Sequence, residues 1–301
     1  MTIESPLNTR PAHLQQVAPL PMNELVPEES ADAPKKQPKL VKSIISFLLK
    51  AQKYSAYGFL AFFGLHASSV VVAPALGISS TGIQDYFEMT RAVYLSPLFE
   101  YPVVHGCALA HVFSGVSIRI LRLLSSQRTK RATAERDIVI QDVQREDIGL
   151  GGIGSIFGFG FKKSWISSTI PSLTPLTFSG YVLSVGLLYH MWKMKWRPII
   201  VDGDSSLVTL NFITHYLSPE INGKGWAAFN LAMLGLLLWV SFYHMVSGLF
   251  KYRRQVSSRA KKIAYGIITA FTTMSFISIG RFMLWPLDVS FIGKQFNKYL
   301  F

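Results

Sequence analysis

Residues 226–250 decide the fold class, because they read WAAFNLAMLGLLLWVSFYHMVSGLF without one charged side chain. An α-helix needs roughly 20 predominantly apolar residues to cross the hydrocarbon of a bilayer. Four other stretches are long and apolar enough to do the same: 55–77, 98–122, 173–194 and 263–286. Core helices of a soluble protein are rarely so long and so evenly apolar. The sequence therefore predicts an all-α membrane protein with five transmembrane helices.

The composition agrees with a membrane protein and gives its orientation. Of the 301 residues 50% are hydrophobic and 16% charged, which excludes a disordered chain. The 30 Lys and Arg outnumber the 17 Asp and Glu. The basic clusters KKQPKLVK (35–42), RILRLLSSQRTKR (119–131) and KYRRQVSSRAKK (251–262) flank predicted spans and lie on one side of a five-span topology. The positive-inside rule then predicts a cytosolic N-terminus and a C-terminus across the membrane, whereas a nucleic-acid-binding protein would gather its charge on one recognition face.

The segments outside the spans give weaker indications. Residues 1–39 are rich in proline, acids and amides, and we expect a disordered cytosolic tail. Residues 40–54 form an amphipathic juxtamembrane segment, for which a helix on the lipid surface and an extension of the first span are both open. The membrane domain is expected over 55–290. The lone Cys107 excludes a disulfide framework, and neither a secretory signal nor a matrix presequence is evident, so composition does not reveal the organelle.

The predicted cytosolic loop 123–172 contains a literal G-x-G-x-x-G match at Gly149, Gly151 and Gly154. A dinucleotide site needs a helix directly after this pattern and an acidic residue about 20 positions later. No acid follows until Asp202, so we reject a dinucleotide site. The aromatic residues after the glycines are more typical of a loop that rests on lipid headgroups.

Four histidines fall inside four consecutive predicted spans: His66, His111, His190 and His244. Polar residues at this depth usually face the interior of the bundle. His111 and His244 occur in the same pattern, HVFSG and HMVSG, in which Gly115 and Gly248 lie one helical turn after the histidine. Gly186 lies one turn before His190. An imidazole with a small neighbour suits a haem, because the imidazole reaches the iron and the glycine leaves room for the ring.

Counting along the spans predicts two histidine pairs stacked across the bilayer: His111 with His244, and His66 with His190. His105, six residues before His111, faces elsewhere. Arg119 lies where a cation could meet a haem propionate or anchor the helix at the interface. The alternatives are plain helix packing, with each imidazole bonded to a neighbouring helix, and proton or ion transport, for which the buried acids are missing. A compact site for a bare metal ion would need closer ligands, so haem iron is the only metal expected here, bound as haem b.

The layout of histidines on the first four of five helices resembles the di-haem cytochrome b subunits of succinate dehydrogenase and fumarate reductase, a four-helix bundle plus one. A Pro-rich tail before such a core is similar to a fungal mitochondrial outer-membrane family with a haem-binding-like domain. One member of that family recruits a bridge-like lipid-transfer protein of the vacuolar-protein-sorting-thirteen family through a Pro-x-Pro motif. The matching stretch here is QQVAPLPMNEL (15–25), with Pro19, Leu20, Pro21 and Val17 as the implied contacts.

The resemblance implies a multi-pass adaptor of the mitochondrial outer membrane that recruits this lipid-transfer protein to organelle contact sites and supports lipid homeostasis. Its C-terminus would lie in the intermembrane space. The alternatives are a di-haem b-type cytochrome in electron transfer, and a lipid scramblase or transporter. No enzyme is expected, because the sequence offers no nucleophile, phosphate-binding loop or carboxylate pair. Redox activity would depend on bound haem.

Overall fold

The computed structural model describes residues 39–132, 173–255 and 257–300, and within these ranges every regular element is a helix. Four helical segments are long and apolar enough to cross a membrane: Leu40–Ala75, Pro97–Ser125, Pro219–Tyr252 and Ser258–Met283. They overlap four of the five predicted apolar stretches over most of their length, which confirms those four stretches as candidate spans. The tail 1–38 and most of the cytosolic loop, 133–172, lie outside the described residues.

The first span is one continuous helix. α1 (Lys39–Ala67) passes through the π-helical turn η2 (Ser68–Val72) into α2 (Ala73–Ala75). Residues 40–54 are therefore the first part of α1, and no break separates them from the apolar stretch. Gly77, with φ +84°, ends the segment in a conformation that side-chain-bearing residues rarely adopt.

The second and fourth spans both follow short lead-in turns. α4 (Pro97–Phe99) and the π-helical turn η3 (Glu100–Gly106) lead into α5 (Cys107–Ala132). α12 (Pro219–Tyr252) begins where the hydroxyl of Ser218 accepts hydrogen bonds from the amides of Glu220 and Ile221 at 3.2 and 3.4 Å. Gly223, at φ +74°, kinks α12 below its apolar part. α13 (Ser258–Met283) is capped in the same way by Ser257, whose hydroxyl accepts from the amide of Ala260 at 3.1 Å.

The stretch 173–194 behaves differently from the other four. It forms α9 (Pro175–Met191), 17 residues long, which continues through the π-helical turn η4 (Trp192–Trp196) into α10 (Arg197–Asp202). α9 has 17 residues, fewer than the roughly 20 that a crossing needs, and it is not among the candidate spans. The predicted fifth span is therefore not confirmed.

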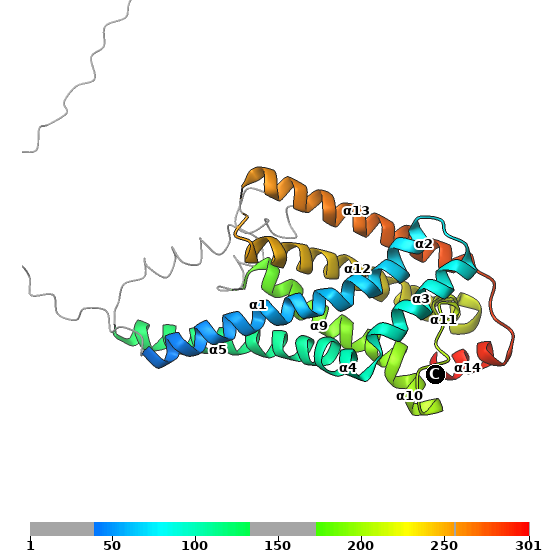
Figure 1. Cartoon of the computed structure of the whole chain (residues 1–301), viewed down its shortest axis with the longest axis horizontal. Coiled ribbons are helices and arrows are strands. Elements are labelled where there is room, and N and C mark those ends of the chain that lie inside the picture. The colour runs from blue at the N-terminus through cyan, green and yellow to red at the C-terminus, as the bar shows by residue number, and fades with distance from the viewer. Residues whose placement is uncertain (1–38, 133–172, 256, 301) are drawn as a thin grey trace, which may run out of the picture. The chain divides into compact units, whose positions relative to one another are not determined.

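Helices α1 and α5 pack along each other, and α12 packs against both α9 and α13 (Figure 1). The segment formed by η2 and α2 contacts α13. Between these groups, aromatic side chains meet. The rings of Phe63 and Phe242 lie 5.4 Å apart between centroids, and those of Phe242 and Phe271 stack at 5.0 Å.

Short helices gather at one end of the long ones: α3 (Ser80–Tyr94), α10, α11 (Asn211–Leu217) and α14 (Phe291–Leu300) (Figure 1). α11 and α14 contribute to a core of buried side chains that includes Phe212, Tyr216, Phe296 and Tyr299. α14 is amphipathic, because these apolar positions face the core while Lys294 and Lys298 are exposed.

Polar contacts hold this end layer together. The guanidinium of Arg91 in α3 donates to the backbone oxygens of Ser205, Ser206 and Val208. Burial lowers the pKa of Arg91. Asp202 accepts hydrogen bonds from Gln295, at 2.6 Å, and from the hydroxyl of Tyr299. The chain end is thus fixed to α10 and α11 by both packing and hydrogen bonds.

Candidate functional site: two histidine pairs between the helices

The structure brings four histidines from four different helices together in two pairs. The ring centroids of His66 in α1 and His190 in α9 lie 6.2 Å apart. Those of His111 in α5 and His244 in α12 lie 6.1 Å apart, with the rings almost perpendicular at 89°. These are the two pairs that counting along the spans predicted.

The two pairs lie at different depths. His111 contacts the backbone of Gln52 in α1, and Gln52 precedes His66 by fourteen residues on the same helix. At 1.5 Å per residue, the two levels are about 21 Å apart. Both levels fit within the roughly 30 Å of hydrocarbon that a bilayer offers.

At the pair His111–His244, backbone and hydroxyl groups fix one nitrogen of each ring. Nδ1 of His111 lies 2.9 Å from the carbonyl oxygen of Gln52. Nδ1 of His244 lies 3.1 Å from the hydroxyl of Ser179 and 3.2 Å from the carbonyl oxygen of Leu176. A carbonyl only accepts, so each Nδ1 carries the proton and each Nε2 keeps a free lone pair. Metal-binding histidines are held in this way by their second nitrogen.

The close approach of α9 to α12 requires a glycine that sequence reasoning missed. A Cβ atom on Gly180 would lie 2.9 Å from Cε1 of His244. Only glycine therefore admits the imidazole at this crossing. A local sequence pattern can link a histidine only to a glycine on the same helix. Gly180, however, contacts His244 from a neighbouring helix.

The three predicted glycines have different neighbours. A Cβ on Gly115 would lie 2.8 Å from Nε2 of Gln52, and one on Gly186 would lie 3.3 Å from Cδ1 of Leu237. Side chains of the protein itself occupy those two positions. At Gly248 no heavy atom lies within 4 Å of the Cβ position, so this glycine leaves open space one turn after His244.

The pair His66–His190 is packed more tightly. The ring of His66 stacks on Phe62 at 5.6 Å, and its Nδ1 lies 3.4 Å from the hydroxyl of Tyr94 in α3. Burial raises the pKa of Tyr94 to about 12, so its hydroxyl stays protonated and can donate to His66. The cavity beside His190, lined also by Leu237, has a volume of about 10 Å³. A single water molecule needs at least that much room.

Other candidate residues lie apart from the pairs. The guanidinium of Arg119 lies 5.9 Å from the ring centroid of Tyr181, a cation–π distance. His105 joins neither pair; its Nε2 lies 4.0 Å from Oε1 of Glu100, which also forms an ion pair with Lys195 across η3 and η4. The implied partner-binding residues Val17, Leu20 and the two prolines beside them lie outside the described residues.

Two facing imidazoles are donors of the kind that would hold a haem iron. Metal–imidazole bonds are about 2 Å long, so two rings on opposite sides of one metal have centroids about 6 Å apart. Both pairs meet this separation. Within the residues that the structure describes, no three His, Cys, Asp or Glu converge on one point. Two imidazoles alone suit a metal that brings its own remaining ligands. The free space, however, lies at Gly248, so His111–His244 fits a haem better than His66–His190.

The chain matches one family of known proteins. The family described as "MDM10-complementing protein 1, transmembrane domain" matches residues 61–165 and 185–290. The Mitochondrial adapter protein MCP1 of Saccharomyces cerevisiae is 31% identical over 239 residues, which cover 79% of this chain and 74% of the yeast protein. No solved structure matches the chain.

The two matched segments are nearly equal in length, and the first paired histidine of each stands in an equivalent place. His66 and His190 are each the sixth residue of a segment, and each precedes a π-helical turn by two residues, η2 at Ser68 and η4 at Trp192. The two His-x-x-Ser-Gly motifs follow, one in each segment. The pattern indicates two equivalent halves, α1 with α5 and α9 with α12, and each histidine pair joins one half to the other.

Proposed function

The chain belongs to the MDM10-complementing protein 1 family, and from this membership we propose that it is an adaptor of the mitochondrial outer membrane that recruits a bridge-like lipid-transfer protein to organelle contact sites. The observation that carries the proposal is the similarity to the yeast Mitochondrial adapter protein MCP1 over 79% of the chain. The four candidate spans supply the membrane anchor that an adaptor of this kind needs.

The tail 1–38 is the proposed partner-binding part, and the partner is proposed to belong to the vacuolar-protein-sorting-thirteen family. Pro19-Leu20-Pro21 pre-sets an extended backbone, and apolar neighbours such as Val17 would act as anchors in a groove of the partner. The basic segments at the cytosolic ends of the spans support a cytosolic tail.

The proposed topology has α9 crossing the membrane as a fifth span. Two observations support it. α9 packs along α12, and its His190 lies opposite His66 of the first span. With five crossings, a cytosolic tail places α14 and the chain end in the intermembrane space.

Recruitment tests the adaptor proposal. In cells that lack the endogenous protein, the double substitution Pro19→Ala, Pro21→Ala should abolish the accumulation of the fluorescently tagged lipid-transfer protein on mitochondria. The matched control, Pro34→Ala with Pro38→Ala in the same tail, should leave recruitment intact. Unchanged recruitment by the first variant at equal protein level would show that this motif is not the binding site.

We propose as a second candidate that the membrane core binds haem b, because the imidazoles of His111 and His244 face each other with their Nδ1 protons held by hydrogen-bond acceptors. His111 and His244 would hold the iron, and Gly248 would leave room beside it. A bound haem would supply one-electron redox chemistry. Acceptors on Gln52, Ser179 and Leu176 hold the proton on Nδ1 of the two rings, which leaves Nε2 as the nitrogen that would bind the iron.

Haem content of the purified protein tests this candidate. Wild type should show b-type bands in a reduced-minus-oxidised spectrum, and His244→Ala should lose them. Gly248→Leu should lose haem while the unliganded fold keeps its stability, since the leucine enters open space. A wild-type protein without b-type bands after supplementation with haem would refute haem binding and leave the adaptor proposal untouched.

A further inference from the structure

Charges are segregated between the two ends of the long helices. In the part of the chain that the structure describes, every acidic residue lies at the end formed by α3, α10, α11 and α14 and the starts of α5 and α12 (Figure 1): Asp85, Glu88, Glu100, Asp202, Asp204, Glu220 and Asp288. The opposite end, where α12 ends and α13 begins, carries a basic turn: Lys251, Arg253, Arg254, Arg259, Lys261 and Lys262. Among the described residues, no acidic side chain lies at that end to neutralise this turn.

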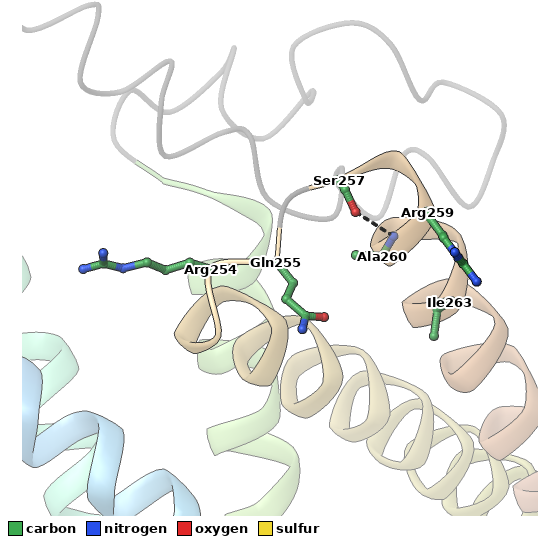
Figure 2. Close-up of a pocket in the computed structure, with 6 residues that line it drawn as sticks. All are labelled: Arg254, Gln255, Ser257, Arg259, Ala260 and Ile263. Atoms are coloured by element: carbon green, nitrogen blue, oxygen red, sulfur yellow. Dashed lines mark hydrogen bonds between the residues drawn. The ribbon is translucent and has the colours of Figure 1, made fainter.

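The basic turn borders a hollow. A cavity of about 520 Å³, open to the outside, is lined by Arg254, Gln255, Ser257, Arg259, Ala260 and Ile263. Figure 2 shows Arg254 extending away from the other five residues, whereas Gln255 points below the turn and Ile263 lies below Arg259 on α13. The residues around the hollow thus carry two guanidinium groups that point apart, an amide and an apolar side chain, Ile263, which is 50% exposed.

The backbone of the turn is held in an unusual conformation. Arg254 has φ +52°, in the left-handed region that arginine rarely adopts. Its amide donates to the carbonyl oxygen of Lys251 at 3.0 Å, and the amide of Gln255 donates to that of Phe250 at 3.0 Å. These bonds close the end of α12 and set the direction in which Arg254 leaves the helix. Backbone strain of this kind tends to persist where the surroundings or a function require it.

We propose that this turn binds the headgroup of an anionic phospholipid, of the phosphatidylserine class, in the leaflet that contacts the ends of α12 and α13. Guanidinium groups bind phosphate and carboxylate oxygens in a bidentate manner. Clusters of basic residues directly beside a span attract anionic lipids. The exposed Ile263 one turn inside α13 would contact the glycerol and the first acyl carbons. The inference concerns the membrane core and does not depend on the recruitment of a partner.

Affinity for short-chain lipids tests the site. The purified full-length protein in a neutral detergent is titrated by calorimetry with a short-chain phosphatidylserine, with the matching phosphatidylcholine and with inorganic phosphate. Phosphatidylserine should bind, and the other two should bind far more weakly. Each cation near an anionic lipid contributes roughly fivefold to affinity, so Arg254→Asn with Arg259→Gln should weaken phosphatidylserine binding about thirtyfold.

The variants are chosen so that misfolding does not imitate the result. Asparagine tolerates the left-handed conformation at position 254, so the turn is expected to persist. The matched control removes two exposed cations from the opposite end, Lys294→Gln with Lys298→Gln, and should keep wild-type affinity. Equal loss in both double variants would indicate general charge attraction and overturn the site. Phosphate binding as tight as lipid binding would overturn the site as well. So would an unchanged affinity for phosphatidylserine after the two arginine substitutions.

Discussion

Replacing Gly180 by alanine probes the crossing of α9 and α12 at His244. The added methyl group would lie 2.9 Å from Cε1 of the imidazole, closer than nonbonded carbon atoms approach. The ring has little freedom to move away, because its Nδ1 is bonded to Ser179 and Leu176. Forcing a methyl group into such a contact costs about 1–3 kcal/mol. The gain in helix propensity from glycine to alanine offsets about 1 kcal/mol of this cost, so we expect a net loss of up to about 2 kcal/mol.

Two glycines on the same helices serve as controls. Gly186→Ala would place its Cβ 3.3 Å from Cδ1 of Leu237, a side-chain end that can turn, so a smaller loss is expected. Gly248→Ala meets no atom within 4 Å and should be neutral or stabilising by up to about 1 kcal/mol. Equilibrium unfolding in mixed micelles, followed by tryptophan fluorescence, gives the three free energies of unfolding. If Gly180→Ala were as stable as Gly248→Ala, the two helices would not enclose the imidazole as described.

Three further predictions concern residues outside the histidine pairs. Glu100→Gln should destabilise the fold by about 3 kcal/mol, because it leaves the half-buried Lys195 unpaired. The double variant with Lys195→Met should recover part of this loss in the same unfolding assay. Ser218→Ala should cost about 1 kcal/mol, since it removes the cap of α12. Hydrogen bonds from Ser290 lower the pKa of Asp288. The ionised carboxylate therefore stabilises the fold above the ordinary pKa of aspartate, and this contribution is lost as the pH falls through the lowered pKa. In thermal melting between about pH 6 and about pH 3, the melting temperature of Ser290→Ala should fall less steeply with pH than that of wild type.

The sequence predicted the features that follow from the length of an apolar stretch and from the regular spacing of residues along a helix. A stretch such as 226–250 needs no partner to be recognised as a span, because hydrocarbon thickness sets its length. The histidine pairs were also accessible, since the depth of His111 and His244 follows from counting residues along straight helices. The stretch that holds α9 was predicted as a span like the others, but it is not confirmed as one. Neighbouring helices bond its polar groups, Ser179 to His244 and Tyr189 to Asn230.

Contacts between helices could not be predicted in this way. Gly180 lies far in the sequence from His244, so no local pattern links them. The space at Gly115 appeared open from the sequence, but Gln52 of α1 occupies it. The layer of short helices around Phe212 and Phe296 depends on chain reversals that apolar periodicity does not specify. In each case the missing information is which helix faces which.

The central claim is that two equivalent halves face each other through His66–His190 and His111–His244. Cysteine cross-linking tests it most directly. In a Cys107→Ser background, double variants that place cysteine at 66 and 190, or at 111 and 244, should be joined by a short bismaleimide in membranes. The exchanged pairs, 66 with 244 and 111 with 190, are about 20 Å apart in depth and should not be joined. Cross-linking of the exchanged pairs, or of none, would contradict the pairing.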